Sequence, residues 1–335
     1  MAELSLIDIE PLFGNDDAKR QETDRRIRDA VFDTGGFVIA NYPDADKVDA
    51  RAETMLSFFD LADDHKRSVA SRVMAPDNAW IYRGYMATLG AVNETQHEIY
   101  DIGPDDPVDG PPIPGMAILA EQNIWPAVEP VSGWSATMRA YYQHMDDIAM
   151  EVMLSVGRAA GFSDDDLLSR FDGGNSTLRL LNYPELPIDT VVVDEMPDDR
   201  HPDGDGTPLA SGRHTDGAGV SLLWQRQPGL QAQAPDGRWR DVPRIENCIS
   251  VHLGDVLETM TDGEVPATPH RVVNLGTARQ SVGYFLEPAL SAPLSPIESD
   301  EAAGDPLLGR GTYGWHLLRR LHNYPPYKHL VPWPS

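Results

Sequence analysis

The chain has 335 residues, 41% of them hydrophobic, with 7 Trp, 11 Tyr and 8 Phe; this is enough apolar material for a sizeable core and excludes wholesale disorder. Its 27 Lys and Arg against 53 Asp and Glu leave a formal net charge of −26. Such a field repels nucleic acid and anionic membrane surfaces, so we expect neither as a partner.

The first residues lack a basic segment followed by an apolar run, and nowhere do eighteen apolar residues stand together. Both absences favour a soluble, cytoplasmic protein. The spacing then predicts a strand over residues 4–9, a helix over 16–32 capped by Asp16 or Asp17, a strand over 37–40 after a Gly-Gly break, and a helix over 45–60.

Between residues 76 and 114 the chain becomes rich in aromatic, Pro, Asp and Gly residues. Long segments of this kind are often functional. Tyr82, Arg83 and Tyr85 are therefore candidates for a substrate entrance, with packing on the helices as the alternative.

A helix is predicted over residues 138–160, where apolar residues recur at helical spacing. It contains His144-Met145-Asp146. Residues two apart do not face each other on a helix, so we interpret His144 and Asp146 as surface groups and not as a ligand pair. A strand over 178–183 follows, and an acidic segment over 189–206 is interpreted as a solvated loop or a lid.

From residue 212 onward the pattern indicates mostly β-structure and then a closing helix over 313–321. The predicted strands cover residues 220–224, 230–234, 248–253, 256–260, 271–275 and 280–286. Short strands at this spacing are typical of a jelly roll, so the fold class is α+β with a mainly β core. We expect an N-terminal region, residues 1–120, packed on a core of residues 121–335 in one compact unit.

His214, Asp216 and His270 are the candidate metal ligands. In an extended strand, residues two apart point to the same side, so His214 and Asp216 can present an imidazole and a carboxylate to one point, and His270 can complete the set. Two histidines and one carboxylate on one face of an octahedron, with open positions opposite, suit Fe(II) in oxygen-activating enzymes.

Arg279 and Ser281 share one face of the last predicted strand with Gly283 and Phe285. A guanidinium two residues from a hydroxyl makes a clamp for a carboxylate, and Arg stays charged where burial would neutralise Lys. Tyr183 could add a hydroxyl to the same carboxylate.

These motifs together resemble the Fe(II)/2-oxoglutarate-dependent dioxygenases of the isopenicillin N synthase-like group. The resemblance runs from about residue 4 to residue 321 and includes His214-Thr215-Asp216, His270-Arg271-Val272, Arg279-Gln280-Ser281, Asn182-Tyr183-Pro184, Gly35-Gly36-Phe37 and Phe58-Phe59-Asp60-Leu61. It implies a double-stranded β-helix, iron held by the three candidate ligands, and O2 and 2-oxoglutarate as co-substrates. It also implies that the 5-carboxylate of 2-oxoglutarate meets Arg279 and Ser281, with Tyr183 as a further contact.

The expected reaction is oxidative decarboxylation of 2-oxoglutarate coupled to oxidation, most commonly hydroxylation, of a small molecule. An alternative is an iron oxidase of the same group that does not use 2-oxoglutarate, and a metal-free jelly-roll binding protein is a third hypothesis. His252 stands where many relatives have Asn, which indicates a different environment near the iron. The candidate substrate contacts, whose two arginines favour a carboxylate-bearing substrate, are Arg179, Tyr82, Arg83, Tyr85, Trp224 and Phe285.

Overall fold

Two β-sheets form the centre of the computed structural model, which describes residues 4–88, 95–105, 117–188, 206–294, 311–324 and 327–331. The larger sheet has eight strands. In spatial order they are β1 (Ser5–Asp8), β2 (Gly36–Ala40), β10 (Ile249–Leu253), β7 (Val220–Gln225), β12 (Arg279–Leu286), β5 (Thr177–Tyr183), β4 (Glu98–Ile102) and β3 (Gly84–Ala87). The smaller sheet has the order β6 (Leu209–His214), β11 (His270–Val273), β8 (Leu230–Gln233) and β9 (Trp239–Asp241). Apart from the parallel β1–β2 pair, neighbouring strands are antiparallel, as the predicted jelly roll requires.

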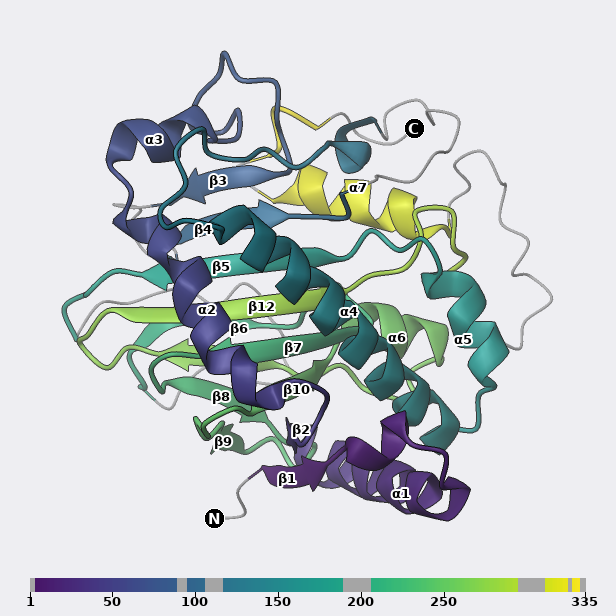
Figure 1. Ribbon diagram of the computed structural model, residues 1–335. Coiled ribbons are helices and arrows are strands. Elements are labelled where there is room, and N and C mark those ends of the chain that lie inside the picture. Colours follow the sequence, from purple (N-terminus) through teal and green to yellow (C-terminus); the bar gives the residue numbers. More distant parts are fainter. Residues whose placement is uncertain are drawn as a thin grey trace.

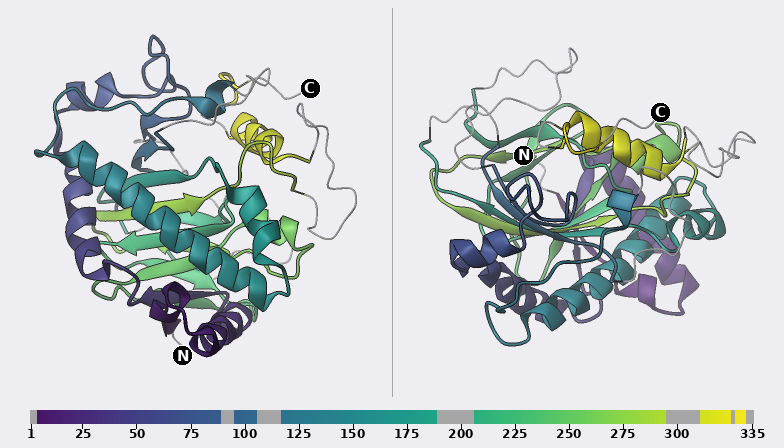
Figure 2. Two further views of the ribbon diagram at one scale, coloured as in Figure 1. Left: turned by 45° about the vertical axis from the view of Figure 1, so that its right-hand side comes forward. Right: turned by 90° about the horizontal axis from the view of Figure 1, so that it is seen from above.

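Helices cover one face of the larger sheet (Figure 1). α4 (Trp134–Ala159) runs diagonally across this face beside α2 (Val48–Leu56), and both contact β12. The apolar stripe predicted for α4 is buried, including Tyr141, Met145 and Val152. The other α-helices are α1 (Asp17–Thr34), α3 (Asp63–Ser68), α5 (Asp164–Phe171), α6 (Asp255–Met260) and α7 (Tyr313–Asn323). Figure 2 shows α7 on the opposite side of the larger sheet from α4.

The predicted helix signals at the N-terminus are confirmed. The Asp16 carboxylate accepts a hydrogen bond from the Lys19 backbone N–H, 3.2 Å away, and so caps α1. Gly35 ends the helix at φ 73°, a conformation that favours glycine. The helix predicted over 45–60 is interrupted, because 3-10 turns at Ala45–Lys47 and Ser57–Asp60 flank α2. Two further 3-10 turns are Glu10–Phe13 and Ala117–Ala120.

The N-terminal region supplies both edges of the larger sheet. β2 pairs with β10, and β4 pairs with β5, so strands from before residue 120 flank strands from after it. We propose that the regions 1–120 and 121–335 unfold together, because the ladder bonds between them break when either opens. A single calorimetric transition is the expected result, and two separated transitions would contradict it.

Two predictions from the sequence need correction here. Residues 256–260 form helix α6 and not a strand, because the buried residues Val256, Leu257 and Met260 follow helical spacing. His144 and Asp146 are half-buried and bonded rather than free on the surface: His144 Nε2 lies 2.6 Å from the carbonyl oxygen of Pro43, and Asp146 accepts from the Tyr284 hydroxyl. The acidic segment lies outside the described residues, except for its last residue. Among the described residues, no helix combines the length and the apolar character needed to cross a bilayer.

Candidate metal centre and anion site

His214 and His270 are brought together by the smaller sheet. They are Cα partners at the end of β6 and the start of β11, and their ring centroids lie 4.3 Å apart. Each Nδ1 lies close to a backbone carbonyl oxygen two residues earlier, at 2.8 Å for His214 and Gly212 and at 3.0 Å for His270 and Thr268. Since a carbonyl only accepts, each Nδ1 carries the proton and each Nε2 keeps a free lone pair.

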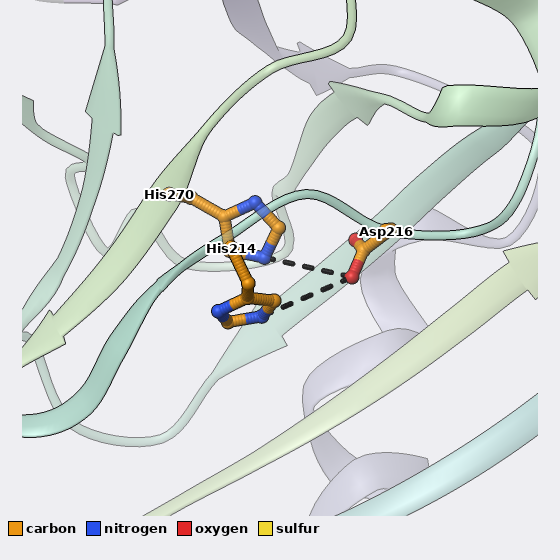
Figure 3. A group of neighbouring side chains, drawn as sticks. All are labelled: His214, Asp216 and His270. Atoms are coloured by element: carbon orange, nitrogen blue, oxygen red, sulfur yellow. Dashed lines mark ion pairs between the residues drawn. The ribbon is translucent and has the colours of Figure 1, made fainter. Parts of the chain in front are cut away.

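Asp216 completes the set from the segment that follows β6 and not, as predicted, from within a strand. β6 ends at His214, and the segment is held where the Asp255 backbone N–H donates to the Asp216 carbonyl at 2.8 Å. The Asp216 Oδ1 lies 4.0 Å from His214 Nε2 and 3.6 Å from His270 Nε2 (Figure 3). Ser221 donates to the other oxygen, Oδ2, at 2.6 Å, so the carboxylate offers one oxygen to the histidines.

The three side chains fit a transition metal. One ligand atom from each residue lies within 4.8 Å of the others, and two imidazoles with one carboxylate leave coordination positions for exogenous ligands. Burial lowers the pKa of His270, which favours the neutral imidazole that binds metals. Burial raises the pKa of Asp216, but His270, His214 and Ser221 together bring it below its ordinary value. His270 and Asp216 thus present the protonation states that metal binding needs.

Replacing Ser221 with alanine is expected to weaken Fe(II) binding by about ten- to a hundred-fold, because the hydroxyl fixes the orientation of the Asp216 carboxylate. Equilibrium titration of the apoprotein with Fe(II) under anaerobic conditions measures the change. Ser250→Ala, on the neighbouring strand β10, is the control: its hydroxyl donates to the Leu223 carbonyl, and iron affinity should not change. Equal affinities for the two variants would contradict a role for Ser221 at the metal.

A buried cation lies on the facing sheet. Arg279 is 7% exposed; its Nη1 donates to Ser281 Oγ at 3.1 Å and its Nη2 to Gln225 Oε1 at 3.2 Å. No carboxylate among the described residues pairs with it, and its buried Nε has no acceptor there. Its Cζ lies 5.7 Å from the centroid of the Tyr183 ring. A buried guanidinium without a counterion is the arrangement expected of a site for an anion.

Arg179 and Phe285 lie further along the same face. Arg179 donates from Nε and Nη2 to the two carboxylate oxygens of Asp101, at 2.8 and 2.7 Å, and its Cζ lies 5.7 Å from the Phe285 ring centroid. Both side chains remain partly exposed. A Cβ on Gly283 would lie 2.9 Å from a ring carbon of Phe285, so the glycine leaves space for this ring.

The other predicted substrate contacts are located differently. Trp224 lies on the helix-covered face, where its Nε1 donates to Asp49 Oδ1 at 2.7 Å. Tyr85 lies in the core, with its ring centroid 5.8 Å from that of Phe58. Arg83 is 1% exposed and donates to Thr177 Oγ1 at 2.8 Å. These contacts give each of the three side chains a packing or hydrogen-bonding role, and their contact with a substrate stays a prediction. Tyr82, whose hydroxyl lies 3.4 Å from Thr177 Oγ1, stays a candidate.

Glu287 follows β12 and is buried, with one carboxylate oxygen 3.4 Å from Thr177 Oγ1. Burial raises the pKa of Glu287 to about 7, although Arg83 opposes the shift. Because the folded pKa exceeds the unfolded one, the stability that Glu287 contributes is full below pH 4.5 and is lost as the pH rises through about 7. As the pH rises from 5 to 8, the free energy of unfolding of Glu287→Gln should therefore increase relative to that of the wild type by up to about 3 kcal/mol. Urea unfolding of both proteins at each pH measures the difference. A difference independent of pH would contradict this.

The sequence and the structure of this chain are similar to those of known iron- and 2-oxoglutarate-dependent enzymes. Residues 177–288 match the family model of the 2OG-Fe(II) oxygenase superfamily, and residues 4–128 match that of the non-haem dioxygenase in morphine synthesis N-terminal region. Isopenicillin N synthase of Streptomyces clavuligerus is 29% identical over 333 residues, 96% of each chain. The 2-oxoglutarate-dependent dioxygenase citB of Monascus ruber is 28% identical over 308 residues, 88% of each chain. The crystal structure of a full-length Neurospora crassa protein in complex with alpha-KG and 5-formyluracil superimposes with a TM-score of 0.71 at 25% identity, over 94% of this chain and 95% of that one.

Proposed function

The chain belongs to the 2OG-Fe(II) oxygenase superfamily, within the isopenicillin N synthase-like group, and we propose that His214, Asp216 and His270 hold its iron. It is an enzyme that uses Fe(II), O2 and 2-oxoglutarate to oxidise a small molecule. Bound iron supplies the activation of O2. The protein holds the iron from one side, and Ser221 and two backbone carbonyls orient its ligands.

Arg279, which has no carboxylate partner among the described residues, carries the assignment of the co-substrate. We propose that Arg279 and Ser281 bind the 5-carboxylate of 2-oxoglutarate, with Tyr183 beside it. In support, the guanidinium is buried, it has no carboxylate partner among the described residues, and Ser281 accepts one of its hydrogen bonds. One carboxylate of a dicarboxylic acid would supply the missing negative charge there and leave the other end free for the iron. The alternative, an iron oxidase that does not use 2-oxoglutarate, is not favoured, because the matched relatives include enzymes named for 2-oxoglutarate.

For the substrate we propose contacts with Arg179, Phe285 and Tyr82. Asp101 occupies Nε and Nη2 of Arg179, which leaves Nη1 to donate to a substrate oxygen. Because Asp101 neutralises most of the charge, this oxygen can belong to a carbonyl as well as to the carboxylate that the sequence favours. The Phe285 ring offers an apolar surface beside it.

The proposed outcome is hydroxylation. The test is a screen of small molecules bearing a carboxylate or carbonyl group, with succinate release as the readout and mass spectrometry of the product. A substrate that stimulates succinate release and gains one oxygen atom supports the proposal. Loss of two hydrogens without a gain of oxygen would replace hydroxylation by desaturation or cyclisation.

We also propose a cytoplasmic location, without nucleic acid or membrane as a partner. The net charge of −26 supports this, because both partners are polyanionic surfaces that such a protein avoids. Cell fractionation of the tagged protein and a gel-shift assay with DNA and RNA are the tests, and recovery in the membrane fraction or a shifted band at physiological salt would contradict it.

A further inference from the structure

His252 is a buried imidazole beside the metal centre that the ligand set does not include. It lies near the end of β10, where its Cα partners are Gly36 on β2 and Ser221 on β7. Its side chain is 0% exposed. Its ring meets that of His270 edge to face, with centroids 4.8 Å apart and planes 69° from parallel. It is therefore adjacent both to a metal ligand and to the serine that orients another.

Neither ring nitrogen of His252 has a hydrogen-bond partner among the described residues. A neutral imidazole carries one N–H donor and one acceptor nitrogen, and burying both without partners is unfavourable relative to an apolar side chain. His214 and His270 differ in this respect, because each donates its Nδ1 proton to a backbone carbonyl. Within the described part of the fold, a histidine at position 252 thus gains no hydrogen bond.

The position of His252 indicates what its partner is. The group of mutually close ligand atoms contains His214, Asp216 and His270 but not His252, so this ring is a neighbour of the metal ligands and not a fourth ligand. The coordination positions that two histidines and one carboxylate leave open are filled by oxygen donors in this class of centre. Such an oxygen can accept the imidazole N–H, or, in a bound water, donate to the acceptor nitrogen.

We propose that His252 is a positioning residue that hydrogen-bonds an oxygen atom of an exogenous ligand bound to the iron, either the 1-carboxylate of 2-oxoglutarate or a water molecule. The inference rests on the proposed function, because it requires iron at the three-residue centre. Under this proposal the polar contact to the iron-bound oxygen comes from the His252 imidazole on β10. β10 pairs with β7, where Ser221 is the Cα partner of His252.

The test compares His252→Leu, His252→Asn and the wild type by three binding measurements. The melting temperature of the apoprotein should not fall in His252→Leu, because an unpartnered polar group is removed. Affinity for Fe(II) alone should stay within about threefold. Affinity for 2-oxoglutarate, followed anaerobically by the visible charge-transfer band of the Fe(II) protein, should fall about tenfold, and the band should shift. His252→Asn, which keeps a donor and an acceptor, should recover most of this affinity.

His316→Leu is the matched control. His316 Nε2, on α7, is also buried without a partner among the described residues. This substitution should leave 2-oxoglutarate binding unchanged. The Co(II)-loaded protein without 2-oxoglutarate separates the two oxygen sources, since a changed visible spectrum in His252→Leu with unchanged 2-oxoglutarate affinity identifies the water.

Three results would overturn the inference. If His252→Leu leaves both the 2-oxoglutarate affinity and the Co(II) spectrum unchanged, His252 does not make the proposed hydrogen bond. A loss of Fe(II) affinity as large as the loss of 2-oxoglutarate affinity makes His252 a ligand instead. If the wild type binds Fe(II) but gives no band with 2-oxoglutarate, the proposed function fails as well, which distinguishes that outcome from the failure of His252 alone.

Discussion

Replacing Arg279 with alanine is expected to raise the concentration of 2-oxoglutarate needed for half-maximal turnover by about ten- to a hundred-fold, while Fe(II) binding changes little. The physical reason is the loss of a charged, desolvated contact of roughly 1.5–3 kcal/mol. Folding should not suffer, because the guanidinium is buried without a carboxylate partner among the described residues. Steady-state kinetics at saturating substrate, with melting temperatures of the apoproteins, provide the measurement.

Arg226→Ala is the matched control for this experiment. Arg226 follows β7 directly and is paired with Glu53 at 3.0 Å, but it is well exposed. Removing it should leave the requirement for 2-oxoglutarate unchanged, since exposed ion pairs contribute little. An Arg279→Ala enzyme with the wild-type requirement would refute the assignment of the clamp.

Replacing Asp216 with asparagine is expected to abolish both retention of Fe(II) and turnover. Ser221 donates to Oδ2 of the carboxylate. In the variant the amide oxygen is the acceptor that this hydroxyl needs, so the amide NH2 turns toward the histidines, where it cannot coordinate a metal. The centre then loses one of its three ligands together with its negative charge. Metal analysis after anaerobic gel filtration, combined with succinate release, measures both losses.

The chain carries its own control in the second His-X-Asp sequence. Asp146 lies on α4 and accepts a hydrogen bond from the Tyr284 hydroxyl, a bond that an amide oxygen can also accept. Asp146→Asn should therefore retain iron and turnover at the wild-type level. Loss of iron from this variant, or full iron content in Asp216→Asn, is the outcome that the assignment does not allow.

The sequence was sufficient to predict that His214, Asp216 and His270 lie together and that Arg279 and Ser281 share one face of a strand. Arg279 and Ser281 alternate on one strand, and the structure confirms that their side chains meet. The proximity of His214 and Asp216 was predicted for the wrong reason. It comes from the end of β6 and the segment after it, which a backbone hydrogen bond from Asp255 holds, and the alternation of side chains along a strand does not predict that bond.

Contacts that depend on register between distant strands could not be predicted. Ser221 is fixed to Asp216 and faces His252, while Gln225 meets Arg279 across β7 and β12. A single strand gives the alternation of its side chains but not which residue lies opposite. For the same reason the sequence did not show that Trp224, next to Gln225, lies on the helix-covered face: one step along a strand reverses the direction of the side chain.

The most direct test is an anaerobic titration of the apoprotein, first with Fe(II) and then with 2-oxoglutarate, monitored in the visible region. We expect stoichiometric iron binding, then a charge-transfer band on addition of 2-oxoglutarate, and a band that needs more 2-oxoglutarate in Arg279→Ala. Iron binding without any band would contradict the role of Arg279 and the use of 2-oxoglutarate, and failure to bind iron would contradict the centre formed by His214, Asp216 and His270.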